Sequence, residues 1–514
     1  MVGMLVRLFS AALQGVEATE VEVEVNHVTR DTFRMSIVGL PDTAVRESID
    51  RVLSAISNSA LKFGGGLNTI NLAPADLKKE GPSFDLPIAI ACAIAGMEED
   101  ITNVEQYCLV GELGLDGAIR PVKGVISIAL EARRKGRTKL IVPAANAEEA
   151  AVVDGIEVYG MNNLHDTWLL MTGQKAFAPF YLDRKAFFNS KRDYLADLSD
   201  VKGQHQVKRA LEVAAAGGHN MIMVGPPGTG KSMIAKRMPT ILPDMSEEEA
   251  IETTKIHSIA GRLKENGFMV TRPFRAPHHT ISDAGLLGGG TNPGPGEVSL
   301  AHNGVLFLDE LPEFRRQTLE VLRQPLEDGD VTISRASGSL TFPCQFLLVA
   351  ALNPCPCGFY GDPKRECRCS PPQIDKYRQR ISGPLLDRID LHVEVPLLEY
   401  KELHDGDGGE KSAVVRERVI ETRNRQIDRF KNDKGVNCNA QIPSRLMREY
   451  CAIDEETSQY LEQVMGELSF SARAHDRILK VARTLADLES SENIQLHHLL
   501  EAVQYRTLDR KLLM

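Results

Sequence analysis

The stretch MIMVGPPGTGKSMIAKRM, residues 221–238, constrains the fold of this chain more than any other segment. Gly225 and Gly230 lie in it with four residues between them, and Lys231 and Ser232 follow directly, which is the spacing of a phosphate-binding P-loop. An apolar run precedes the loop and a helical pattern follows it. We therefore predict a buried strand, a glycine-rich turn and a helix, and with them an α/β fold.

The residue types of this loop suit the binding of ATP. Glycines allow backbone N–H groups to approach phosphate oxygens, and the helix N-terminus adds a partial positive charge. Lys231 is expected to reach the β- and γ-phosphates, and Ser232 to ligate Mg²⁺. The predicted ATP-binding residues are Gly225, Pro226, Pro227, Gly228, Thr229, Gly230, Lys231 and Ser232.

Later segments supply polar groups that ATP hydrolysis needs. The run NGVLFLDEL ends in Asp309, predicted to bind Mg²⁺, and Glu310, predicted to polarise the attacking water. The apolar run FLLVAAL ends at Asn353, whose amide is expected to orient the water or the γ-phosphate. Arg388 and Arg473 are candidates for neutralising phosphate charge, because a guanidinium offers a fixed fork of donors. Taken without context, each arginine is more often a solvated surface charge.

In chain order, these motifs resemble those of an AAA+ ATPase. The segment RPFRAPHHTISDAGLLGGGTNPGPGEVSLAHNG resembles the helix-2 insert shared by magnesium-chelatase ATPase subunits and MCM helicases, and GDVTISRASGSLTFP resembles their presensor-1 hairpin. The stretch SARAHDRILKVARTLADL is typical of the lid of this clade. The resemblance implies that ATP lies between subunits, that Arg388 acts as a finger from the neighbouring subunit, and that Arg473 closes from the lid.

The first 175 residues contain two stretches, INLAPADLKKEGPSFDLPIAIA and LVGELGLDGAIRPVKGVISIALEARRKGRTKLIVP, that look like the Lon protease fold. Ser83 falls where Lon carries its nucleophile, which Lon pairs with a lysine. That lysine position is Ile126 here, and the nearest lysine, Lys123, lies three residues earlier. We therefore predict a Lon-like fold without peptidase activity, in which Ser83 caps a helix.

A Lon-like domain ahead of a magnesium-chelatase-like AAA+ module is the arrangement of the YifB/ComM family of bacteria. The expected organisation is a Lon-like α+β domain at 1–175, a linker at 176–196, an AAA+ core with the helix-2 insert at 197–403, and an all-α lid at 404–514. ComM-type members resemble hexameric helicases that promote branch migration of DNA during natural transformation. The resemblance thus implies a homo-hexamer acting on single-stranded, forked or branched DNA.

Four of the nine cysteines lie in NPCPCGFYGDPKRECRCS, as the Cys-x-Cys pairs Cys355/Cys357 and Cys367/Cys369. Four thiolates can form a closed tetrahedral Zn²⁺ site. An odd number of cysteines with four in one cluster fits a reducing cytoplasm and a metal site better than a disulfide framework. We predict a structural zinc ion here; the alternative is a set of free buried thiols.

The predicted DNA contacts are local, because 60 basic and 70 acidic residues give a net charge of −10. Arg335 lies at the turn region of the predicted hairpin, where six copies would line a channel with guanidinium groups suited to phosphates. His278 and His279 of the insert are candidate contacts in a second layer. The alternative for Arg335 is an ordinary exposed hairpin charge.

Two further expectations concern the membrane and rival functions. No run of 18 or more apolar residues occurs, so the sequence predicts no transmembrane helix, and the start of the chain indicates a strand rather than a signal peptide. The rival functions are an ATPase that drives metal insertion by a chelatase partner, a protein-remodelling ATPase and an active Lon-type protease.

Overall fold

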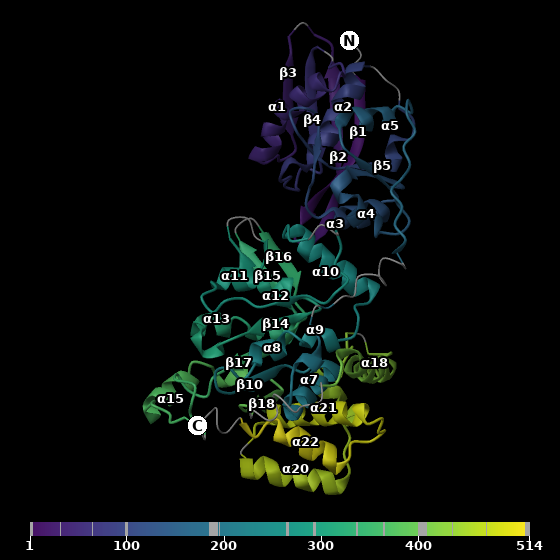
Figure 1. The fold of residues 1–514 in the computed structure, drawn as a ribbon. Helices are drawn as coiled ribbons and strands as arrows, with labels where there is room; N and C mark the ends of the chain where they lie inside the picture. The colour runs from purple at the N-terminus through teal and green to yellow at the C-terminus, as the bar shows by residue number, and fades with distance from the viewer. Residues whose placement is uncertain are drawn as a thin grey trace. The chain divides into compact units, whose positions relative to one another are not determined.

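The computed structural model describes residues 4–508, except for 31, 64, 98–100, 185–193, 195, 264–266, 291–293, 336–337, 363–364, 399–408, 434 and 469. The chain forms two compact units (Figure 1). The first comprises Met1–Lys191, Glu247–Val270 and Ala336–Thr341; the second comprises Arg192–Ser246, Thr271–Arg335 and Phe342–Met514. The functional division into Lon-like domain, linker, core and lid stays a prediction.

The first unit is built on a seven-stranded mixed sheet in the order β3-β4-β2-β1-β5-β8-β9. Strands β1, β2 and β4 pair antiparallel, while β3 pairs parallel with β4, and β1, β5, β8 and β9 pair parallel in turn. The bounds are β1 Met4–Gln14, β2 Glu17–Val28, β3 Arg34–Val38, β4 Leu67–Ala73, β5 Tyr107–Leu109, β8 Lys139–Pro143 and β9 Glu157–Met161. Short strands β6 (Glu112–Leu113) and β7 (Ile119–Arg120) form a separate pair.

Strand β2 shows why the sequence forms this sheet. Val21, Val23 and Val25 are fully buried, and the glutamates between them lie partly exposed on the other face, because side chains alternate along a strand. The half-buried strand predicted from TEVEVEVNHV is confirmed. The apolar helix α2 (Asp85–Met97) is buried over almost its whole length and belongs to the core of this unit.

The other helices of the first unit include α10, which lies more than a hundred residues further along the chain than α3. Their bounds are α1 Thr43–Asn58, α3 Val125–Arg134, α4 Ala147–Ala151, α5 Leu164–Met171 and α10 Glu247–Ile259. Ser258 Oγ of α10 accepts from the N–H of Gly124 (2.7 Å) and donates to Glu149 Oε1 (2.5 Å). Glu149 Oε1 also accepts from the N–H of Ile126 (3.0 Å). Burial raises the pKa of Glu149. The hydrogen bonds of this buried network join α10 to α3 and α4.

Ile126 and Ser83 lie in the first unit, at positions relevant to the peptidase question. Ile126 is fully buried in α3, so an aliphatic side chain occupies the place where we expect Lon to carry its lysine. Ser83 lies in the short helix η1 (Pro82–Phe84), directly ahead of α2. Both the Lon-like assignment and the lack of peptidase activity stay predictions.

The second unit is built on a five-stranded, all-parallel sheet in the order β11-β14-β17-β10-β18. The bounds are β10 Met221–Val224, β11 Phe274–Arg275, β14 Val305–Leu308, β17 Leu347–Leu352 and β18 Leu391–Glu394. Every residue of β10, β14 and β17 is buried, as expected for parallel strands covered on both faces. The predicted α/β architecture is confirmed.

Helices and short strands surround this sheet. They are α7 His205–Gly217, α8 Lys231–Ala235, α9 Met238–Ile241, α11 Asp283–Leu287, α12 Glu297–Leu300, α13 Arg316–Glu320, α14 Arg323–Asp328, α15 Pro371–Arg378, α16 Gly383–Leu386, β12 Gly288–Gly289 and β13 Gly294–Pro295. Strands β15 (Asp330–Arg335) and β16 (Gly338–Pro343) pair with each other, where the sequence predicts a hairpin.

The C-terminal part of the second unit is helical, as predicted, and α20, α21 and α22 gather at one end of the unit (Figure 1). The helices are α18 Ser412–Arg429, α19 Met447–Tyr450, α20 Glu455–Leu468, α21 Ala472–Leu488 and α22 Leu496–Gln504. Helix α21 is amphipathic and buries one face in the core of this unit. Within the described ranges, no helix combines the length and apolarity needed to cross a lipid bilayer.

A buried polar network attaches α21 to the sheet. Asp390, just before β18, accepts from Arg477 Nη1 (2.5 Å) and is hydrogen-bonded to His219 Nδ1 (3.2 Å), while His219 Nε2 is bonded to Thr484 Oγ1 (2.7 Å). Burial acts to raise the pKa of Asp390, but Arg477 and His219 outweigh it and hold that pKa below its ordinary value. Burial lowers the pKa of His219. The network therefore favours a carboxylate beside a neutral imidazole.

Candidate nucleotide-binding site and cysteine cluster

The strand order brings three polar loops to one edge of the parallel sheet. β17 lies between β10, which leads into the P-loop, and β14, which leads into Asp309. The carboxyl ends of parallel strands meet at the same edge, where open α/β sheets bind ligands. Asn353, directly after β17, is thereby placed beside both loops, although 122 residues separate it from Lys231.

Lys231 is the centre of this edge. Its Nζ donates to the carbonyl oxygens of Gly225 (2.6 Å) and Pro226 (2.8 Å) and to Asn353 Oδ1 (3.2 Å). Burial lowers the pKa of Lys231 to about 8, although Asp309 acts to raise it. When ATP binds, its charged phosphate oxygens would take the place of these neutral oxygens around the ammonium group.

Ser232 and Asp309, the two predicted Mg²⁺ ligands, lie side by side. Ser232 Oγ donates to Asp309 Oδ2 at 2.5 Å. Hydroxyl and carboxylate oxygens are ligands that Mg²⁺ accepts, and adjacent ligands of its octahedron lie about 3 Å apart. If Ser232 Oγ and Asp309 Oδ2 moved slightly apart, both oxygens could therefore bind one ion.

Glu310 takes a strained backbone conformation directly after Asp309. Its φ is 52°, in the left-handed region, and its N–H donates to Asp309 Oδ1 (3.0 Å). Such strain in a residue other than glycine is often found at functional sites. The side chain is half exposed, and Oε2 lies 3.5 Å from His279 Nδ1. The candidate base is therefore accessible to water and lies next to His279.

One residue that sequence reasoning missed braces the P-loop. Gln204, at the start of α7, has φ 52°, and its Nε2 donates to the carbonyl of Thr229 at 2.9 Å. The side chain is buried against the loop. A lone glutamine 25 residues ahead of its partner carries no local signal of this role.

The two candidate arginines are placed differently in the single chain. Arg388 is buried, donates through Nη1 to the carbonyl of Pro384 (2.6 Å), and is paired with Glu327 through Nη2. Arg473 is exposed in the first turn of α21. Among the described residues, neither arginine forms a hydrogen bond or ion pair with Lys231, Asp309 or Glu310, so their roles stay predictions.

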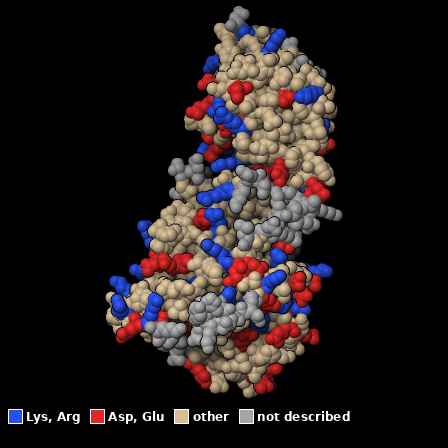
Figure 2. Space-filling model, in the orientation of Figure 1, with Lys and Arg blue, Asp and Glu red and all other residues tan. Residues whose placement is uncertain are grey.

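The predicted DNA contacts are also untested. Arg335 is the last residue of β15, and its side chain lies outside the described residues. His278 and His279 lie between β11 and α11, with ring centroids 4.1 Å apart. His278 Nδ1 is bonded to Thr280 Oγ1 (2.9 Å), while His279 faces Glu310. On the face drawn in Figure 2, acidic and basic side chains intermingle.

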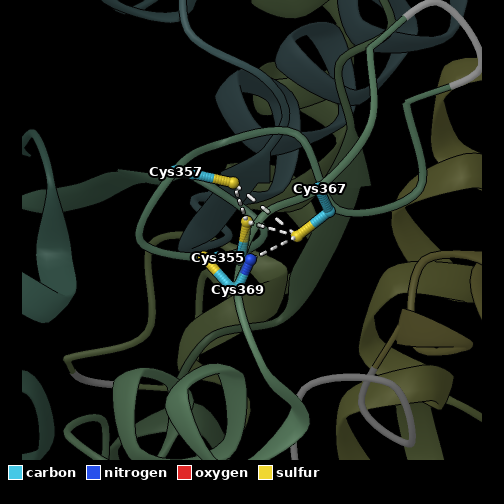
Figure 3. A group of neighbouring side chains, drawn as sticks. All are labelled: Cys355, Cys357, Cys367 and Cys369. Atoms are coloured by element: carbon cyan, nitrogen blue, oxygen red, sulfur yellow. Dashed lines mark hydrogen bonds between the residues drawn. The ribbon is translucent and has the colours of Figure 1, made fainter.

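The four clustered cysteines converge as predicted (Figure 3). The Sγ atoms of Cys355, Cys357 and Cys367 lie 3.3–3.7 Å apart, and all four sulfurs lie within 4.8 Å of one another. None is in a disulfide. With Zn–S bonds of about 2.3 Å, sulfurs at tetrahedral corners would be about 3.8 Å apart. The cluster therefore has nearly the dimensions of a four-thiolate zinc site.

The thiols of this cluster differ in acidity. Backbone N–H groups of Phe359 and Arg368 lower the pKa of Cys357 to about 6. The N–H of Cys369 acts to lower the pKa of Cys367, but desolvation and the neighbouring thiols raise it to about 12. A divalent cation would remove the mutual repulsion of neighbouring thiolates, because it binds them as ligands.

A second group of candidate ligands fits a structural role better. Glu489 Oε2 lies 2.9 Å from His497 Nε2 and 3.1 Å from His498 Nε2. His498 Nδ1 accepts from the N–H of Gln495 (3.0 Å), so a neutral ring carries its proton on Nε2. That nitrogen donates to Glu489 and has no free lone pair for a metal. Through His498, which forms a capping box with Gln495, this group stabilises the start of α22.

The parallel sheet places the P-loop strand, the asparagine strand and the acidic strand side by side, as expected for the P-loop core of an AAA+ module, and a family model assigns this core to the magnesium-chelatase class. Three family models match the chain: "Magnesium chelatase, subunit ChlI" over residues 197–403, "Subunit ChlI of Mg-chelatase" over 21–146, and the "ChlI C-terminal" model over 409–506. The chain belongs to the YifB/ComM family.

The relatives that carry this assignment match over nearly their full length. YifB of Escherichia coli (strain K12) is 45% identical over 504 residues, covering 98% of this chain and 97% of the relative. Competence protein ComM of Haemophilus influenzae is 44% identical over 508 residues, covering 98% of each. DNA repair protein RadA of Bacillus subtilis is 32% identical over 121 residues, 24% of each chain.

Proposed function

We propose that this protein is a hexameric AAA+ ATPase that translocates on DNA and promotes branch migration of transforming DNA. The observation that carries the ATPase part is the convergence of Lys231, Asp309 and Asn353 at one sheet edge. The DNA part is supported by the full-length similarity to a competence protein and by the partial similarity to a DNA repair protein.

In the proposed reaction, each side chain has one task. Lys231 binds the β- and γ-phosphates, Ser232 and Asp309 hold Mg²⁺, and Glu310 polarises water for attack on the γ-phosphorus. Asn353 orients that water or the phosphate. Catalysis consists of positioning and charge neutralisation, because phosphoryl transfer requires little covalent chemistry from the protein.

Completion of the site by a neighbouring subunit is the second part of the proposal. Arg388 would reach the neighbour's ATP after exchanging Glu327 for phosphate, and Arg473 would close from the lid of its own chain. The buried pairing of Arg388 supports this idea, because an already desolvated guanidinium loses little hydration when a phosphate replaces the carboxylate.

We also propose one structural Zn²⁺ per chain, held by Cys355, Cys357, Cys367 and Cys369. The sulfur separations support it. Elemental analysis of purified protein should find about one zinc per chain. Replacing Cys355 and Cys367 with serine should remove the metal.

The test of the DNA function uses forked and four-way-junction DNA with the full chain. The proposal expects binding that weakens as salt rises, because phosphate contacts release counterions, and strand movement that requires ATP. Arg335→Ala should lose DNA-stimulated ATPase activity and keep the basal rate. Wild-type protein that lacks DNA affinity at low salt would contradict the proposal.

The second candidate function is an ATPase that drives metal insertion or protein remodelling. The matches to magnesium-chelatase subunit models favour it. It predicts ATP hydrolysis that DNA does not stimulate. The DNA experiment therefore separates the two candidates.

A further inference from the structure

The turn Cys355–Gly358 of the cysteine cluster lies directly against the P-loop. Gly358 is buried, has φ +85°, and donates its N–H to the carbonyl of Cys355 at 2.9 Å. A Cβ built on Gly358 would lie 2.5 Å from Cδ and 3.0 Å from Cγ of Pro227. Atoms of a proline ring cannot rotate away, so any side chain at this position would displace the P-loop.

The same segment is attached to Asn353, the residue expected to orient the water or the γ-phosphate. Asn353 lies two residues before Cys355, and its Oδ1 accepts from Lys231 Nζ. The hydroxyl of Tyr377 accepts from the N–H of Asn353, and Arg378 Nε donates to the carbonyl of Pro354 (3.4 Å). The end of β17 thus contacts the P-loop at Lys231 and the cysteine turn contacts it at Pro227, while α15 holds the segment between these two points.

A metal ion would make this assembly rigid. Four thiolate bonds would join the turn at Cys355 and Cys357 to the second pair at Cys367 and Cys369, and closed four-thiolate sites contribute directly to folding. Without the ion, the cluster loses this cross-link. The turn that supports Pro227 would then be free to shift.

We propose that Gly358 is a positioning residue for the P-loop, and that metal bound by the four cysteines sets ATP affinity through the contact between Gly358 and Pro227. The inference rests on the proposed ATPase and the proposed zinc site. It concerns binding, because the contact acts on the loop that surrounds the phosphates and not on the attacking water. ATP affinity would thereby follow the metal content of the protein.

The matched variants are Gly358→Ala and Gly361→Ala. Both glycines have positive φ, +85° and +80°, so alanine meets the same backbone strain at either position. A Cβ on Gly361 has no atom within 4 Å, whereas a Cβ on Gly358 meets Pro227. Isothermal titration with ATP should show at least tenfold weaker binding for Gly358→Ala, with zinc content unchanged. Gly361→Ala should bind ATP like the wild type.

Two further arms keep the result interpretable. Adding Pro227→Ala to Gly358→Ala removes the ring that the new Cβ meets, so the double variant should bind ATP more tightly than Gly358→Ala. Stripping zinc with a zinc-selective chelator, with Mg²⁺ in excess, should weaken ATP binding, and added zinc chloride should restore it. If Gly358→Ala folds poorly, recovery of folding in the double variant would show that the clash between the new Cβ and Pro227 is the cause.

The outcomes separate this inference from those on which it depends. Wild-type affinity in Gly358→Ala, or unchanged ATP affinity in folded, zinc-free protein, overturns the inference and leaves the ATPase intact. Protein that binds ATP but no zinc overturns the metal part. Wild-type protein that binds no ATP overturns the ATPase proposal itself, and the inference with it.

Discussion

At the residue scale, the candidate nucleotide site has an ammonium group held by neutral oxygens. Lys231 donates to two carbonyls of its own loop and to an amide oxygen, and it is largely removed from water. With its pKa at about 8, Lys231 gains or loses its proton within the pH range in which ATP binding can be measured. ATP needs the charged form, because the phosphates carry the compensating negative charge.

The first prediction follows from this pKa. ATP affinity should change little between pH 7 and 8 and fall above pH 8, because the unliganded lysine is then neutral and must take up a proton on binding. The dissociation constant should rise about tenfold per pH unit, the linkage expected for one proton. Titration calorimetry in buffers of different ionisation enthalpy measures both the affinity and the proton uptake. A flat affinity between pH 7 and 9.5 would contradict the assigned pKa.

The second prediction concerns Glu310. Glu310→Gln should bind ATP and reduce turnover by about 100-fold or more, because an amide cannot accept a proton from the attacking water. Steady-state phosphate release and ATP binding are measured on the same protein. Glu313→Gln is a control, because Glu313 forms an exposed ion pair with Arg380 and has no assigned role at the phosphates. Normal turnover in Glu310→Gln would refute the assigned base.

At the element scale, the strands that end in polar residues could be predicted from sequence, but the order of these strands in the sheet could not. Apolar runs of strand length identify β14 and β17, and the polar residues after them mark the site. The order that inserts β17 between β14 and β10 is set by contacts far apart in sequence. The same holds for the pairing of Arg388 with Glu327, which leaves no local pattern.

The third prediction concerns the attachment of α21. Arg477→Ala should lower the free energy of unfolding by about 3–5 kcal/mol, because it leaves Asp390 buried without its main partner. Chemical denaturation measures the change. Arg473→Ala, one turn earlier and exposed, should change stability by about 0.5 kcal/mol or less. Equal effects of the two variants would show that the buried network does not stabilise the second unit.

The fourth prediction is the pH dependence of this network. Burial holds the pKa of His219 below its ordinary value of 6.5, so the unfolded chain binds a proton that the folded chain does not. Stability should therefore fall as pH drops below about 6.5. The depressed pKa of Asp390 adds a further loss below its ordinary value of 3.8. Denaturation of His219→Gln should show a weaker slope between pH 6.5 and 5.

At the scale of the whole molecule, the proposed ring divides each ATP site between two chains. Arg388 is already desolvated in the single chain, and its present partner Glu327 is half exposed. In the proposed ring, this pair would open toward a neighbouring subunit. The proposed division would make activity a property of interfaces, not of single chains.

The fifth prediction tests this division. Arg388→Ala and Lys231→Ala should each be inactive, for different reasons: the first lacks the finger and the second lacks the phosphate ligand. Mixing them should restore part of the ATPase activity at interfaces that combine an intact P-loop with an intact Arg388. Phosphate release is measured across mixing ratios after subunit exchange. Absence of rescue at every ratio, with exchange shown independently, would contradict the shared site.

The membership of α10 in the first unit has a consequence for how such chains can be shortened or recombined. Residues 247–270 lie inside the P-loop half of the sequence, yet Ser258 is bonded to Gly124 and Glu149 of the other half. A cut near residue 196 would place these partners on different fragments and leave a buried glutamate without its hydroxyl donor. A chimera that takes its N-terminal half from a relative must therefore carry a matching α10 with it.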